Sequence, residues 1–131
     1  MLIIRTEQIQ HFIAKDDSEL VKLIAGIMRT ASAERVAGHP DETLETMVQT
    51  GIERARTHNF DRAEDIAAFV AVMFEVSPTF DENDEIKTIL DEPSFPVEDR
   101  FEQLWERVPD ETWKKLENEY DAKNWFPDQP Q

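Results

Sequence analysis

The chain has 131 residues, no cysteine and a formal net charge of −15, from 14 lysines and arginines against 29 aspartates and glutamates. This length is typical of one domain, and a hydrophobic content of 40% is enough for a core. The lack of cysteine excludes disulfides, thiolate catalysis and cysteine-based zinc sites. The negative charge argues against nucleic acid and anionic membranes as partners, because phosphate groups are bound by clustered cations.

The amino-terminal segment does not look like a targeting sequence. Met1 to Arg5 contains neither a basic region nor a long apolar stretch, so we expect no signal peptide. No segment reaches the length of about 20 apolar residues that a membrane helix needs. A cytoplasmic protein is therefore expected.

The first third of the chain is predicted to be mainly helical. Residues 2–4 favour a short extended segment, and Thr6 can cap a helix whose apolar positions are Ile9, Phe12 and Ile13. Residues 16–18 either break the chain or lie inside one longer helix, and the helix that follows them is expected to reach about Ala37, with Gly38 as its C-cap. Its apolar face comprises Leu20, Val21, Leu23, Ile24, Ile27 and Met28.

The next helix is predicted from Pro40 to about His58. Its apolar positions recur at helical spacing, and Gly51 among them would permit a close helix crossing. These positions are Leu44, Met47, Val48, Ile52 and Ala55. The short connection that follows predicts an antiparallel neighbour.

Residues 62–76 form the most apolar part of the chain. The run from Ile66 to Phe74 has no polar interruption, which is typical of an element surrounded by neighbours. A buried strand is the competing interpretation, but Asp61 as N-cap and the acids of the first turn favour a helix. We expect an all-α, single-domain bundle of five or six helices around this central helix.

The last third is predicted to contain three shorter helices. The first is opened by Asp81-Glu82-Asn83-Asp84 and ends near Leu90, the second runs from Val97 to Val108, and the third starts at Pro109. A short aromatic segment at Trp125 and Phe126 follows. The single domain would cover residues 1–131, with a frayed tail at about 127–131.

One metal-site pattern can be tested against the sequence. Asp81-Glu82-Asn83-Asp84-Glu85 begins like a calcium-binding loop and Glu92 falls at its twelfth position, but the sixth position, normally glycine, is Ile86. A helix start rich in acids is the better interpretation. His11, His39 and His58 are too widely spaced to predict a metal site. We therefore predict no catalytic residue, no metal and no cofactor.

The charge is unevenly distributed along the sequence. Residues 1–60 have a net charge of −2 and residues 61–131 a net charge of −13. Solubility is one explanation, and a docking surface for a basic protein is the other. The aromatic residues likewise fit either core packing or anchoring of a partner. The predicted partner-binding residues are Glu75, Asp81, Glu82, Asp84, Glu85, Asp91, Glu92, Glu98, Asp99, Trp125 and Phe126, of which the last two are expected to be exposed.

Three stretches of the sequence resemble a family of small bacterial proteins. They are MLIIRTEQI at the start, GIERARTHNFDRAEDIAAFVAVMF at residues 51–74, and SPTFDEN followed by ILDEP. The family is encoded beside type VI secretion effectors of the PAAR and VgrG kind. The resemblance implies either an immunity protein, which binds and neutralises a toxin, or an adaptor that loads an effector. It transfers no functional residue.

Overall fold

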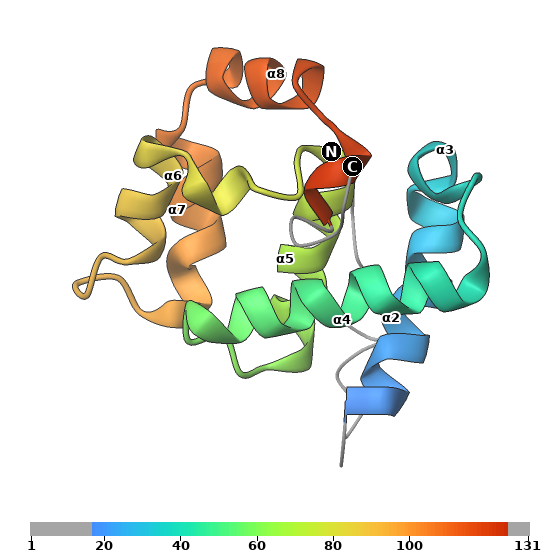
Figure 1. Cartoon of the computed structure of the whole chain (residues 1–131). Coiled ribbons are helices and arrows are strands. Elements are labelled where there is room, and N and C mark those ends of the chain that lie inside the picture. The colour runs from blue at the N-terminus through green and yellow to red at the C-terminus, as the bar shows by residue number, and fades with distance from the viewer. Residues whose placement is uncertain (1–16, 126–131) are drawn as a thin grey trace. The chain divides into compact units, whose positions relative to one another are not determined.

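The computed structural model describes residues 17–125. It contains seven α-helices and three short 3₁₀ helices over this range, and no strand within it (Figure 1). The elements are α2 (Asp17–Ala31), α3 (Ala33–Val36), α4 (Asp41–Thr57), α5 (Ala63–Glu75), η1 (Phe80–Glu82), α6 (Asp84–Leu90), η2 (Val97–Asp99), α7 (Arg100–Arg107), α8 (Asp110–Asn118) and η3 (Ala122–Trp125). The all-α prediction is confirmed. The predicted extended segment at residues 2–4, the helix capped by Thr6 and the tail at 127–131 lie outside the described range.

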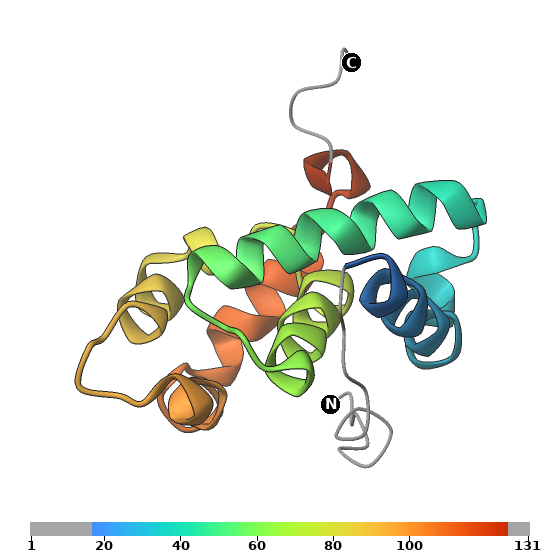
Figure 2. The same ribbon diagram turned by 90° about the horizontal axis from the view of Figure 1, so that it is seen from below.

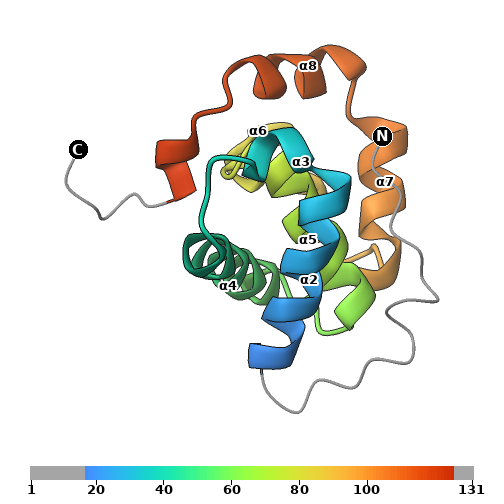
Figure 3. The ribbon, with the colours of Figure 1, turned by 90° about the vertical axis from the view of Figure 1, so that its right-hand side faces the viewer.

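The chain divides into two compact units, which we call the N-terminal unit (Met1–Glu75) and the C-terminal unit (Val76–Gln131). Helices α2 to α5 belong to the first, and α6 to α8 belong to the second. In the C-terminal unit α6 contacts α7, and Figure 3 shows the chain continuing from α7 through α8 to η3. That residues 1–131 form a single domain stays a prediction.

Helices α2, α4 and α5 form the core of the N-terminal unit and all three contact one another. The five apolar positions predicted for α4 are all buried, and so is Gly51. On α5, eight residues are buried, which confirms the prediction that this helix is enclosed on nearly every side. Helix α4 is a neighbour of α5, as predicted, but lies across it and α2 rather than antiparallel to α5 (Figures 1 and 2).

The crossing of α4 and α5 is closest at Gly51. A Cβ atom at this position would lie 2.8 Å from Cγ2 of Val70 and 3.3 Å from Sδ of Met73. Real Cβ contacts are longer than 2.8 Å, and the β-branched side chain of Val70 cannot easily rotate away. The prediction that Gly51 permits a close helix crossing is therefore confirmed.

The connection between α4 and α5 is held by aromatic packing. Asn59 has a φ of 71°, in the left-handed region that Asn tolerates better than most residues. Phe60 is fully buried, and its ring centroid lies 5.9 Å from that of Phe69 on α5.

Helix α5 begins at Ala63, and the carbonyl of Arg62 accepts the first helical hydrogen bond, from Ile66. The prediction of Asp61 as N-cap is therefore wrong by one position.

The helix predicted to reach residue 37 is interrupted at Ser32, which has a φ of −125° and separates α2 from α3. Its hydroxyl donates to Oε1 of Glu75 at the end of α5, at 2.5 Å. Ser32 is buried, so this bond satisfies a hydroxyl that water does not reach. A long-range hydrogen bond thus accompanies the interruption, and sequence periodicity carries no information about it.

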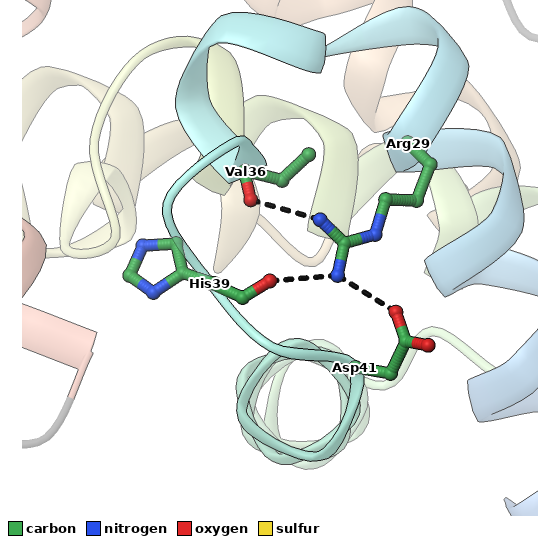
Figure 4. A network of polar contacts seen from close by, with 4 residues as sticks. All are labelled: Arg29, Val36, His39 and Asp41. Atoms are coloured by element: carbon green, nitrogen blue, oxygen red, sulfur yellow. Dashed lines mark hydrogen bonds and ion pairs between the residues drawn. The ribbon is translucent and has the colours of Figure 1, made fainter.

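The end of α3 is capped by an arginine from α2 (Figure 4). The Arg29 guanidinium donates to the carbonyl oxygens of Val36 at 2.9 Å and His39 at 2.7 Å, and to Oδ1 of Asp41 at 2.8 Å. Terminal carbonyls of a helix need such donors because no helical N–H group follows them. Gly38 does not have a positive φ, and the C-cap is Ala37, so the predicted glycine cap is wrong. Arg29 instead donates hydrogen bonds to the carbonyl groups at the end of α3 and in the turn after it.

We predict that Gly51→Ala lowers the free energy of unfolding by about 1–2 kcal/mol, because overpacking exceeds the gain in helix propensity. Gly26, inside α2, is the matched control, since a Cβ atom there would have no neighbour within 4 Å. Gly26→Ala should raise stability by up to about 1 kcal/mol. Urea unfolding of both variants measures the two effects. Equal or greater stability of Gly51→Ala would contradict the close crossing.

A second prediction concerns the Arg29 cap. Arg29→Lys keeps the charge but loses the planar fork that reaches two carbonyls at once, so we expect a loss of about 1–2 kcal/mol. Asp41→Asn is the control, because the Asp41 side chain is 86% exposed and an exposed ion pair contributes about 0.5 kcal/mol or less. Thermal unfolding at equal ionic strength compares the two. If Asp41→Asn costs as much as Arg29→Lys, the ion pair rather than the carbonyl cap is important.

Candidate protein-binding surface

The exposed charges of the C-terminal unit are mostly negative. Among residues 76–125, thirteen carboxylate side chains and five basic side chains are exposed. In the N-terminal unit, residues 18–75 expose six acids and three bases. The acidic character that the sequence indicates is therefore present at the protein surface, and it is much stronger in the C-terminal unit.

Six of the predicted partner-binding acids are exposed and are available to a partner. They are Glu82, Asp84, Glu85, Asp91, Glu98 and Asp99. These residues occupy η1, α6, η2 and the turns beside them. Whether they contact a partner stays a prediction.

Two predicted acids are half-buried. Glu75 accepts the hydrogen bond from Ser32 described above. Glu92 accepts a hydrogen bond from the backbone N–H of Ser94, at 3.1 Å, in the turn after α6. Both side chains therefore have a structural role within the chain, and Glu75 belongs to the N-terminal unit rather than to the acidic one.

Two further predicted residues are buried. Asp81 is only 6% exposed, so its expected place on an acidic surface is wrong. Trp125 is 1% exposed, so the expected exposure of its side chain is also wrong. Its indole Nε1–H donates to the hydroxyl of Tyr120 at 3.0 Å, which pairs the polar atom of a ring that is otherwise enclosed. Phe126 lies outside the described residues.

Helix α6 is positioned by its N-cap. The Asn83 side chain accepts hydrogen bonds from the backbone N–H groups of Glu85 at 3.0 Å and Ile86 at 3.2 Å. Asp84 and Glu85 lie in the first turn, where negative charge is favourable. Ile86 is fully buried within the helix, so residues 84–90 cannot also form a calcium-binding loop. The interpretation as a helix start is confirmed.

Helix α8 is tied to α6 by a polar contact between exposed side chains. The Thr112 hydroxyl donates to Oε1 of Glu85 at 3.2 Å. Helix α8 has no buried residue: Trp113 and Leu116 are only half-buried, and so is Tyr120 just after the helix. Much of the surface of this unit is therefore made of helix faces that carry acids beside partly exposed apolar side chains.

Trp105 on α7 is the one large hydrophobic side chain among residues 17–125 that is exposed, at 37%. Its ring centroid lies 5.1 Å from that of Trp113 on α8 and 6.1 Å from that of Phe101. From the sequence, exposure was predicted for Trp125 and Phe126 and not for Trp105. The signal that could have identified Trp105 is its helix position, beside Glu102 and Glu106 and one residue from the buried Leu104.

The described histidines do not form a metal site. His39 supplies only its backbone carbonyl to Arg29, and the His58 ring lies 5.6 Å from that of Phe69. Among residues 17–125, no group of three His, Asp or Glu side chains is arranged to hold a metal ion. His11 lies outside this range. In the same part of the chain, no helix is both long and apolar enough to span a membrane.

Comparisons with known proteins gave no match: no family model fits the sequence, and neither the curated proteins nor the solved structures contain a significantly similar chain.

Proposed function

We propose that this protein binds a protein that has a basic surface and neutralises it, as an immunity protein neutralises a toxin. The observation that carries the proposal is the excess of exposed carboxylates, thirteen against five exposed basic side chains, in residues 76–125. Such an excess creates a negative potential that speeds the encounter with a basic partner and disfavours acidic ones. The resemblance to proteins encoded beside type VI effectors supports the choice of a toxin as the partner.

The proposed mechanism is occlusion rather than chemistry. Exposed acids of η1, α6, η2, α7 and α8 would cover a cationic surface or active site of the toxin. A toxin that cuts nucleic acid would present such a surface, because its substrate channel must attract phosphates. Association would be fast and dependent on salt, and desolvated polar contacts would make dissociation slow. The proposal assigns no catalytic residue, cofactor or metal.

An adaptor that carries an effector to the secretion machinery is the alternative. The tagged full-length chain can be used to capture the partner from the source cells, and the partner is then identified. The immunity and adaptor roles can then be compared directly. The partner should arrest growth when expressed alone in a test host and should not do so when the chain is co-expressed. A partner that stays toxic in the presence of the chain, and whose secretion fails when the chain is deleted, would establish the adaptor role instead.

We predict that Asp84→Lys, Asp91→Lys and Glu98→Lys, combined, slow association with the captured partner about tenfold or more at low salt. The same triple variant should also show a weaker dependence of the association rate on ionic strength. All three side chains are exposed in the C-terminal unit, and thermal unfolding checks that the variant stays folded, because Asp84 lies in the first turn of α6, where negative charge is favourable. Stopped-flow kinetics over a salt series measures both effects.

A matched control is provided by Glu34→Lys, Glu42→Lys and Glu53→Lys, combined. These three side chains are exposed in the N-terminal unit, and their reversal changes the net charge by the same amount. We expect a change in association rate of less than about threefold, because only the general attraction is reduced. Equal effects of the two triple variants would show that total charge, and not the C-terminal unit, governs binding.

A further inference from the structure

The rings of Trp105 and Trp113 lie against each other at the surface of the C-terminal unit. The two rings come from α7 and α8, with centroids 5.1 Å apart and planes inclined by 46°. Phe101 supports the Trp105 ring from one turn earlier on α7, with centroids 6.1 Å apart. A ring with two aromatic neighbours is held in its orientation, so binding of a ligand costs little side-chain entropy of Trp105.

Acids share the helix faces on which these two tryptophans lie. Glu102 precedes Trp105 by three positions on α7, and Asp110 and Glu117 flank Trp113 at three positions before and four after on α8. Residues at these spacings share a helix face with the tryptophan. All three carboxylates are exposed. The rings are therefore accompanied by negative charge on both helices.

The nearest basic residues on these helices are placed differently. Lys114 follows Trp113 by one position, which points it about 100° away around the helix. Arg107 is engaged elsewhere: its guanidinium carbon lies 5.1 Å from the centre of the Phe95 ring, and its Nε donates to Oε1 of Gln103 at 2.6 Å. The chain itself thus contains a guanidinium over an aromatic ring in the same unit.

We infer that the surface formed by Glu102, Trp105, Asp110, Trp113 and Glu117, with the buried Phe101 behind the Trp105 ring, receives an arginine side chain of the basic partner. Tryptophan binds cations over its face more strongly than any other side chain, and the planar guanidinium also stacks on the ring. A neighbouring carboxylate can accept two of its N–H groups at the same time. The inference rests on the proposed function, and it specifies where one anchoring contact lies and which chemical group makes it.

The probe for the test is a blocked peptide that contains four arginines separated by glycine and serine. Two control peptides replace arginine with lysine or with citrulline, which keeps the shape of the side chain but has no charge. The full-length chain is observed through the indole N–H signals of its tryptophans in NMR spectra. The Trp105 signal, assigned from Trp105→Phe, should move with the arginine peptide, move less with the lysine peptide and stay in place with the citrulline peptide.

Substitutions test the two parts of the surface separately. Trp105→Leu should weaken binding of the arginine peptide about fivefold, and Trp105→Phe should weaken it less. Glu102→Gln with Asp110→Asn should also weaken it, whereas Glu34→Gln with Glu42→Gln in the N-terminal unit should have little effect. Melting curves check that each variant is folded. If Trp105→Leu unfolds the chain, the comparison of Trp105→Phe with the wild type decides.

Equal binding of the arginine and lysine peptides, or an unchanged affinity of Trp105→Leu, would overturn the inference. In that case the proposed function still stands if charge reversal at Asp84, Asp91 and Glu98 slows association with the partner. If that reversal does not change the association rate, the proposed function is contradicted, whether or not the arginine peptide binds at Trp105.

Discussion

The close contact of α4 and α5 at Gly51 is the constraint on which the packing of the N-terminal unit depends. With no side chain at this position, Val70 and Met73 of α5 approach the backbone of α4 directly. Eight residues of α5 are buried as a result of such contacts, and the helix carries its charged residues only at its two ends. The unit therefore has an extensive apolar core, and its polar long-range contacts, Arg29 to the α3–α4 turn and Ser32 to Glu75, lie at helix ends.

The C-terminal unit is organised differently. Its helices are short, α8 buries no residue, and its 16 acids outnumber its 6 bases over residues 76–131. Several acids stabilise the unit locally: Asp84 and Glu85 in the first turn of α6, and Asp110 and Glu111 in the first turn of α8. Together, however, they repel one another, and the repulsion opposes the compact state. A cationic partner would relieve this repulsion, so binding and stability of the unit are expected to be linked.

Sequence periodicity was sufficient to predict the helices whose buried residues recur at helical spacing. The apolar positions of α4, the enclosed helix α5 and the acid-rich start of the helix that ends at Leu90 follow from patterns within a few residues. Contacts between residues on different helices could not be predicted from local spacing. The interruption at Ser32 is tied to a residue 43 positions away, and the end of α3 is capped by a side chain from α2.

The same distinction holds for the candidate surface. The acidic character of residues 81–111 follows from composition, and six of the predicted acids are exposed. The burial of Asp81 and Trp125 could not be read from the sequence, because it depends on tertiary packing. Proximity to the terminus suggested an exposed Trp125, whereas Trp105, within a regular amphipathic pattern, is the ring that reaches the surface.

Hydrogen–deuterium exchange of the chain, measured alone and in complex with its captured partner, tests the central claim most directly. The account predicts that binding slows amide exchange in η1, α6, α7 and α8, with little change in α2 and α4. Protection confined to residues 17–75, with the C-terminal unit unaffected, would contradict it.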